Sequence, residues 1–380
     1  MNELLLQTRG EMPRAALVKN RRLYEILDLD EDAARGAEAV HLGRAGRVMK
    51  SLGALFVTLP GGQEGFLPFS DLPKGFMPKG GDALAVQIRR PAAGGKAARL
   101  SMELTLSGRH AVLLCPGHSA CASRRAENPR ELRALAERLR PEEYGLVLRA
   151  NAEGAAEADI RNEIDALKSR MEALLARAKT APAPALLEGA PGPIARLLRD
   201  VRKAPERAVS DDEAAAAGYG LPVVPSPDPF GLYGVETQLK KALSRRVYLP
   251  SGGTLLLDPC EAGLVIDVNT AGDTARGGDP MLRANLEAAE EIARLLRLRR
   301  AGGIVLIDFI DMKEERHRDA VLARLKDALR DDRTATEVLG FTRLGLVEMT
   351  RRRTEAALPA QKMAAGGTGG EELEGGEADA

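Results

Sequence analysis

Two apolar stretches that each reach an aspartate decide the fold of this chain: GLVIDVN (residues 263–269) and GIVLIDFID (residues 303–311). Each is short, rich in β-branched residues and next to a glycine, which predicts a buried strand. Between them, residues 284–300 carry apolar side chains at helical spacing, so this region predicts a strand-helix-strand unit. Such a unit can bring both strand ends, with Asp267 and Asp308, to one rim of a sheet.

These two aspartates place carboxylates where hydrophobic packing stops. Two carboxylates held close together repel each other unless a proton or a cation lies between them, and Mg2+ commonly binds one or two carboxylates and keeps several waters. The pair therefore favours a magnesium site at Asp267 and Asp308. Either aspartate alone could equally be a helix cap or a turn residue just after a strand, and that alternative stays open at this point.

A series of short motifs extends this signal in order along the chain. They are LPSGG (249–253), IDVN (266–269), RGGD (276–279), NLEAA (285–289), LRLR (296–299) and IDFIDM (307–312). Together they resemble the catalytic domain of the bacterial ribonuclease E/G family, and so many ordered matches are far more specific than one motif. The resemblance implies an endoribonuclease that hydrolyses single-stranded RNA during processing or decay and leaves a 5'-phosphate and a 3'-hydroxyl.

The resemblance also implies roles for individual residues. Asp267 and Asp308 would be catalytic residues that hold Mg2+, with Mn2+ as a substitute, and Asn269 would support one of them by hydrogen bonding. Strand geometry agrees, because residues 267 and 269 of one strand point to the same face. Asp311 is interpreted as a supporting or capping residue. The runner-up hypothesis is an RNA-binding family member with little or no cleavage activity.

Composition restricts the class of protein further. The chain has 380 residues, 55 basic and 55 acidic residues and a formal net charge of zero. The chain as a whole therefore lacks the net positive charge that is typical of a strong nucleic-acid binder. Local clusters of basic residues would have to attract the RNA. No apolar run is long enough for a membrane span and no signal peptide is evident, so we expect a soluble cytoplasmic protein.

Cysteine usage points the same way. Three cysteines are too few for a disulfide framework and fit a reducing compartment. Cys115, His118 and Cys121 are spaced in a way that could bind zinc, but a fourth ligand would have to come from elsewhere, and chance placement in a loop is the better interpretation. Zinc is therefore expected to be absent.

Residues 36–102 predict a small β domain with short strands separated by glycine and proline turns. The segments ALFV (54–57) and GFLP (65–68) resemble the S1 RNA-binding barrel, a member of the OB-fold class. Such barrels bind single strands by stacking bases on exposed aromatic rings. The resemblance implies RNA contacts from Phe56, Phe66 and Lys96. The alternative is that both phenylalanines fill the barrel core.

Residues 103–182 predict a helix at 129–139, a strand near 144–149 and a long amphipathic helix from 155 to about 179. The resemblance implies a 5'-end-binding subdomain that recognises a 5'-monophosphate through Arg149 and through Arg124 of the motif SRR (123–125). This chain differs from the family pattern at two positions of that pocket. Ala150 stands where the family has a threonine, and Ala335 stands where the family has an arginine. Their loss removes charge-assisted donors, so we predict weakened 5'-monophosphate sensing.

The complete expectation is an α/β multidomain chain in which an S1/OB-type barrel is inserted into an RNase H-like module. That module would be formed by residues 1–35 and 183–245, followed by an α/β DNase I-like catalytic domain at 246–360. Residues 361–380 are rich in Gly, Ala and Glu and are expected to form a disordered acidic tail. The family's zinc-binding Cys-Pro-x-Cys and small dimerisation domain are not expected here. A homodimer is possible, but it would lack the family's zinc link.

Overall fold

The computed structural model describes residues 1–29, 32–93, 95–270 and 279–353. The predicted tail at 361–380, the end of the predicted catalytic domain and motif residues 276–278 lie outside this part of the chain. The protein has mixed α/β structure with a closed five-stranded β-barrel, which confirms the predicted fold class at that level. Within the described residues, no helix is both long and apolar enough to cross a membrane.

The first sheet combines both ends of the predicted discontinuous module. Its strand order is β15-β14-β1-β2-β3, in which β1 is antiparallel to β2 and parallel to β14. The strands are β1 (Asn2–Gln7), β2 (Arg14–Lys19), β3 (Arg22–Asp28), β14 (Arg207–Ser210) and β15 (Val223–Pro225). The helices in this part of the chain are α3 (Pro193–Asp200), α4 (Glu213–Ala217), α5 (Pro229–Tyr233) and α6 (Val235–Leu243). Segments about two hundred residues apart therefore share one sheet.

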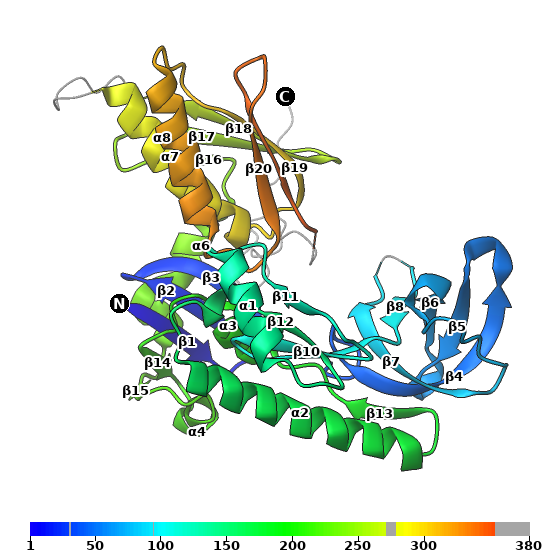
Figure 1. Cartoon of the computed structure of the whole chain (residues 1–380). Coiled ribbons are helices and arrows are strands. Elements are labelled where there is room, and N and C mark those ends of the chain that lie inside the picture. Colours follow the sequence, from blue (N-terminus) through cyan, green and yellow to red (C-terminus); the bar gives the residue numbers. More distant parts are fainter. Residues whose placement is uncertain (30–31, 94, 271–278, 354–380) are drawn as a thin grey trace, which may run out of the picture.

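The barrel lies between these two halves in the sequence and projects to one side of the molecule (Figure 1). Its strands are β4 (Val40–Met49), β5 (Ala54–Thr58), β6 (Glu64–Pro68), β7 (Ala83–Arg90) and β8 (Ala98–Ser101). Pairing of β4 with β7 closes the barrel. The segment 180–193 is rich in Pro and Gly, a composition typical of a connector. It nevertheless contains strand β13 (Ala185–Glu188), which pairs with β4.

A four-stranded sheet with two helices follows the barrel. Its strands are β9 (Leu104–Ser107), β10 (Ala111–Cys115), β11 (Ala120–Ala122) and β12 (Gly145–Leu148), in the order β11-β12-β10-β9. Helix α1 (Pro129–Leu139) has the predicted bounds, and α2 (Glu157–Thr180) differs by two residues at its start. A separate apolar core joins both helices to this sheet.

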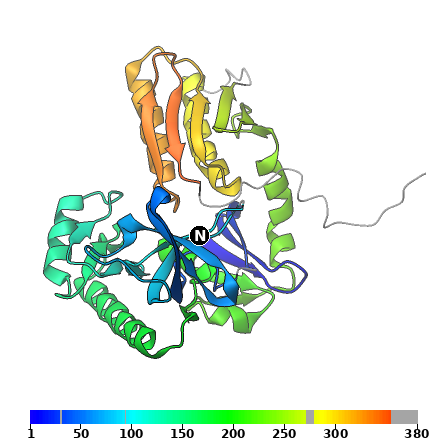
Figure 2. The same ribbon diagram turned by 90° about the vertical axis from the view of Figure 1, so that its right-hand side faces the viewer.

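The last sheet contains the two stretches with which the sequence analysis began. Its order is β16-β17-β18-β19-β21-β20, and β18 and β19 are parallel. The strands are β16 (Arg246–Tyr248), β17 (Thr254–Pro259), β18 (Gly263–Asn269), β19 (Gly303–Asp308), β20 (Thr336–Phe341) and β21 (Val347–Arg351). Helices α7 (Pro280–Leu298) and α8 (Glu315–Leu329) lie on one side of it (Figures 1 and 2).

Helix α7 connects this sheet to the rest of the molecule. It begins four residues before the predicted start, because the Asp279 side chain accepts hydrogen bonds from the backbone of Met281 and Leu282 and Pro280 occupies the first turn. One apolar core contains residues from α7, from both flanking strands β18 and β19, and from β1 to β3. Burial of α7 from two sides therefore fixes the six-stranded sheet against the five-stranded sheet.

Candidate active site

The register of β18 and β19 places Asp267 directly opposite Asp308. Register partners on parallel strands point to the same side of a sheet, and neighbouring strands lie about 4.8 Å apart. Ile266 and Ile307, one residue earlier in each strand, are fully buried against the helices. Asp267 is half-buried and Asp308 is exposed. Both carboxylates therefore lie side by side on the face of the sheet opposite α7 and α8.

Asn269 holds the first of these carboxylates. Its side-chain Nδ2 donates a hydrogen bond of 2.7 Å to Oδ2 of Asp267. The contact arises because the two residues are separated by one position in a strand and so share a face. It restricts rotation of the Asp267 carboxylate and engages one of its two oxygens.

A residue to which the sequence analysis gave no role, Asn285, positions the turn after Asp308. Asn285 lies on α7 and is fully buried. Its Nδ2 donates to the backbone oxygen of Ile310 at 2.8 Å, and the backbone nitrogen of Ile310 donates to Asn285 Oδ1 at 3.0 Å. The signal in the sequence was an amide within the apolar face of a predicted helix. Asp311 is exposed in the same turn.

The ligand types at this site are oxygens of carboxylates and an amide. Within residues 1–29, 32–93, 95–270 and 279–353, no group of three or more His, Cys, Asp or Glu side chains is arranged to hold a metal ion. Cys115 ends β10 and Cys121 lies in β11, and both thiols are free. Two carboxylates with open solvent beside them suit a hard cation that keeps several waters.

The barrel carries two phenylalanines side by side on its outer face. Phe56 on β5 and Phe66 on β6 are register partners, with ring centroids 6.0 Å apart and planes at 72°. Both are half-buried, whereas Leu55 and Leu67 beside them are fully buried in the barrel core. The alternative in which both rings fill that core is therefore wrong.

Two arginines that the sequence analysis did not identify extend this pair of rings into a row. A bulge in β4 places Arg47 opposite Phe56, with Cζ 5.7 Å from the ring centroid. On the other side, Arg99 of β8 is the register partner of Phe66 and forms an ion pair with Asp71 at 3.3 Å. Cationic side chains thus flank the rings at both ends.

The third predicted barrel residue, Lys96, lies outside that row. It is exposed in the turn before β8, where its backbone pairs with that of Ala93. Strand register sets the positions of the two rings and the two arginines, whereas a turn sets the position of Lys96. The Lys96 side chain is nevertheless exposed to solvent on the barrel.

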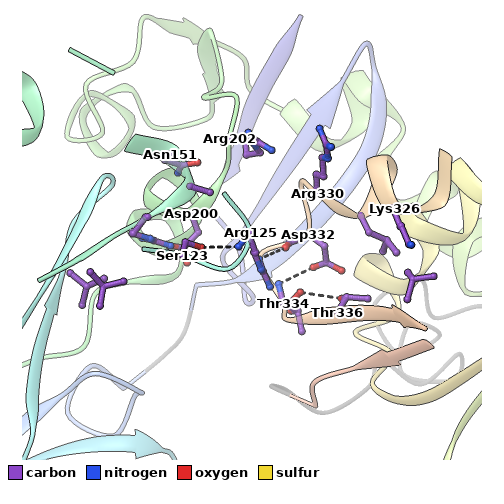
Figure 3. Close-up of a pocket in the computed structure, with 16 residues that line it drawn as sticks. Ser123, Arg125, Asn151, Asp200, Arg202, Lys326, Arg330, Asp332, Thr334 and Thr336 are labelled. Atoms are coloured by element: carbon purple, nitrogen blue, oxygen red, sulfur yellow. Dashed lines mark hydrogen bonds and ion pairs between the residues drawn. The ribbon is translucent and has the colours of Figure 1, made fainter. Parts of the chain in front are cut away.

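A cavity of about 490 Å³ lies between the four-stranded sheet and the segment from α8 to β20 (Figure 3). Of the two predicted phosphate-binding residues, Arg149 lines it, whereas Arg124 is exposed and its neighbour Arg125 lines it instead. The other basic residues of the lining are Arg202, Lys326 and Arg330. Several cations therefore converge on one hollow, which favours an anionic ligand.

Within this cavity Arg149 already has an anionic partner. Its Nη2 donates to Oδ1 of Asp200 at 2.6 Å, and its Nη1 donates to the Gly108 oxygen at 2.8 Å. Burial raises the pKa of Asp200, but hydrogen bonds and charge from Arg199 and Arg149 outweigh it and hold the pKa below its ordinary value. Asp200 is therefore ionised at neutral pH, and its carboxylate is shared between Arg149 and Arg199.

One wall of the cavity is fixed by a buried ion pair. Asp332, which is 1% exposed, accepts hydrogen bonds from Nε and Nη2 of Arg351 at 2.8 and 3.1 Å. The backbone oxygen of Asp332 accepts a further hydrogen bond from Arg125 at 2.7 Å, across the cavity (Figure 3). This network ties the four-stranded sheet to β21 and so holds the two sides of the cavity together.

Comparison with known proteins adds a family match to this geometry. The model of the Ribonuclease E/G family matches residues 105–219 and 223–354. Ribonuclease G of Haemophilus influenzae is 33% identical over 395 residues, and the match covers 94% of this chain and 80% of that protein. Ribonuclease G of Escherichia coli is 32% identical over 395 residues, with 94% and 81% covered. Ribonuclease E of Escherichia coli is 34% identical over 394 residues, but only 37% of its length is covered, against 93% of this chain.

Proposed function

The chain belongs to the ribonuclease E/G family and is an endoribonuclease, and we propose that it cleaves single-stranded RNA by Mg2+-dependent hydrolysis. The observation that carries this proposal is the register of Asp267 with Asp308 on one open sheet face, together with the hydrogen bond from Asn269. In the reaction, the oxygen of water bonds to phosphorus and the P–O3' bond breaks. The O3' of the upstream fragment takes up a proton from the water and becomes a 3'-hydroxyl. The phosphate stays on the 5' end of the downstream fragment.

The residues present fit a divalent metal. Asp267 and Asp308 would hold Mg2+, or Mn2+ in its place, since both ions prefer oxygen ligands and Mg2+ accepts a site of two carboxylates with waters. The chemistry that Mg2+ supplies when bound is activation of a water and neutralisation of charge on the phosphate oxygens. Asn269 orients the carboxylate of Asp267, and Asn285 fixes the turn after Asp308. Asn269 thus holds one carboxylate, and Asn285 holds the backbone that follows the other, before the substrate arrives.

Cleavage and chelation test this proposal directly. Purified protein is expected to cut an A/U-rich single-stranded oligonucleotide when Mg2+ is present and to stop when a chelator is added. End-labelled products should carry a 5'-phosphate on the downstream fragment, which gel mobility before and after phosphatase treatment measures. Retention of RNA binding without any cut would contradict the proposal and leave the family member as a binding protein only.

We further propose that sensing of the 5' end is weakened in this chain. The ion pair between Arg149 and Asp200 supports this idea, because a phosphate would have to share that guanidinium with an ionised carboxylate that repels it. Ala150, which also lines the cavity, offers no hydroxyl donor. Both features lower the gain in binding energy from a terminal phosphate dianion.

The 5' end of the substrate can be varied alone to examine this. One oligonucleotide sequence is prepared with a 5'-monophosphate and with a 5'-hydroxyl, and kcat/KM is measured for both. We expect a ratio close to one, within about threefold, which corresponds to less than about 1 kcal/mol of differential binding. A monophosphate preference of tenfold or more would defeat the proposal. The same pair of substrates with a relative that senses the 5' end provides the control.

The arrangement of sheets supports the predicted division into modules, which we also propose. The strand order β15-β14-β1-β2-β3 agrees with an RNase H-like module, and the closed barrel agrees with an S1-type insertion. The four-stranded sheet with α1 and α2 would be the subdomain that contacts the 5' end. The six-stranded sheet with α7 and α8 would be the DNase I-like catalytic domain. We propose processing or decay of cytoplasmic RNA as the setting.

A further inference from the structure

Strand β16 lies at the edge of the six-stranded sheet and carries two exposed side chains, Arg246 and Tyr248. Tyr248 is 70% exposed and is the most exposed aromatic side chain among the residues that the structure describes. Val247, between the two, is buried in the apolar core that the sheet shares with α7 and α8. Because side chains alternate along a strand, Arg246 and Tyr248 both project from the face opposite those helices.

Strand register connects this edge to the two aspartates. Arg246 is the register partner of Leu256 on β17, and Leu256 is the register partner of Asp267 on β18. Directly opposed residues on neighbouring strands share a face, so Arg246 lies on the open face that carries Asp267 and Asp308. Two strand spacings, about 10 Å, separate its backbone from that of Asp267. The long side chain of Arg246 can therefore reach a phosphate next to the one that is cleaved.

Tyr248 lies in the next row toward the same end of the sheet. It is the register partner of Thr254, and Thr254 is the register partner of Asn269. Tyr248 and Arg246 are two positions apart in one strand, so about 7 Å separates their Cα atoms and their side chains project to the same side. A ring and a guanidinium at this spacing suit one nucleotide, whose base stacks on the ring while its phosphate pairs with the guanidinium.

The charge of Arg246 is available to a ligand. Its side chain is exposed, and it forms no ion pair with another residue in the part of the chain that the structure describes. The neighbouring Arg245, by contrast, is paired with Asp258 at 2.5 Å. Two carboxylates on an open face repel RNA, so a cationic side chain beside them favours the approach of a strand.

We propose that Arg246 and Tyr248, which we call the β16 subsite, bind the nucleotide adjacent to the scissile phosphate. Tyr248 stacks on the base of that nucleotide, and Arg246 pairs with its phosphate. The inference rests on the proposed cleavage at Asp267 and Asp308, and it adds a contact that holds the strand beside them. The occupant is a single strand, because an unpaired base is free to leave its own stack and lie on the ring.

Abasic substrates test the role of Tyr248. One oligonucleotide with a single cleavage site is prepared intact and with one abasic residue at each position in turn. With the wild type, kcat/KM should fall about tenfold when one base beside the cleavage site is missing, because its stacking is lost. With Tyr248→Ala, kcat/KM for the intact substrate should fall by about the same factor, and removal of that base should cause no further loss. Tyr248→Phe, which keeps the ring, should behave as the wild type does.

Salt dependence tests the role of Arg246. Arg246→Met should weaken binding of the intact oligonucleotide about tenfold and reduce the slope of log affinity against log salt concentration by about one, as loss of one phosphate contact requires. The matched controls are Arg133→Met and Tyr219→Ala. Arg133 is paired with Glu137 on α1, and Tyr219 follows α4, so both lie outside the six-stranded sheet. Both controls should match the wild type in affinity, salt slope and response to the missing base.

Two results would overturn the β16 subsite. The missing base could reduce kcat/KM equally in the wild type and in Tyr248→Ala, or Arg246→Met could keep the affinity and salt slope of the wild type. A wild type that cuts none of the substrates would contradict the proposed function instead. Anisotropy with the same oligonucleotides then decides on the subsite, since Tyr248 should still be coupled to one base, and coupling at no position would count against it. Because both side chains are exposed, the melting temperature should stay that of the wild type in every variant.

Discussion

Replacing Asp308 by asparagine is expected to reduce RNA cleavage by about 10²- to 10³-fold, the range seen when one electrostatic contact to a transition state is removed. The amide keeps the size of the side chain but removes the negative charge that a divalent cation requires. Asp267→Asn should have a similar effect, because the two register partners face the same side of the sheet. Single-turnover cleavage of an end-labelled oligonucleotide measures the rate, and fluorescence anisotropy should give RNA affinity near that of the wild type.

Asp258→Asn provides the matched control. Asp258 lies on the neighbouring strand β17, on the same open face of the sheet, but opposite Val265 and paired with Arg245. Its substitution should leave the cleavage rate unchanged. Because residues that act as a unit are not additive, the double variant of both catalytic aspartates should lose little more than either single variant. Wild-type cleavage by Asp308→Asn would place the chemistry elsewhere in the molecule.

Removal of the barrel rings is the second change with a large expected effect, on RNA binding. Phe56→Ala and Phe66→Ala should each weaken binding of single-stranded RNA by about 1 to 3 kcal/mol, the worth of one base stacked on an aromatic ring. The structure supports this because both rings are half-buried on the outer face and lie outside the barrel core. Anisotropy titrations with a short oligonucleotide measure the affinity, and the melting temperature should change little.

Leu52→Ala tests whether any loss of apolar surface on the barrel has the same effect. Leu52 is 57% exposed in the segment between β4 and β5, outside the row of rings and arginines. Its variant should bind RNA as the wild type does. A steep fall in thermal stability of the phenylalanine variants, with RNA affinity retained at low temperature, would instead assign the rings a structural role.

Local elements of this fold were predictable because their signals are local. Helix α1 has the predicted bounds, since Asn128-Pro129 marks its start and apolar side chains recur at helical spacing to Leu139. The barrel was predicted from short alternating strands between glycine and proline turns, and β4 to β8 occupy that region. The start of α7 was predicted less well, because a cap at Asp279 extends the helix beyond its apolar pattern.

The candidate site required information that local patterns do not contain. Arg149 and Asp200 are separated by 51 positions, and their ion pair depends on how α3 packs beside the four-stranded sheet. The proline-rich segment 180–193 contains β13 because an edge of β4 is available for pairing, which proline content does not indicate. Arg297 belongs to the motif LRLR at the end of a predicted helix, and only the packing of α7 from two sides shows that this charged residue is buried.

The sequence by itself determined that Asp267 and Asp308 end apolar strands, that a helix joins those strands, and that Asn269 shares the face of Asp267. These properties follow from residue periodicity within single segments. Only the tertiary structure decided that the two aspartates are register partners on neighbouring strands. It also decided that Arg47 and Arg99 flank the two phenylalanine rings and that Asp200 forms an ion pair with Arg149. Strand register and side-chain pairing across distant segments depend on how apolar faces pack together, which a one-dimensional pattern leaves undetermined.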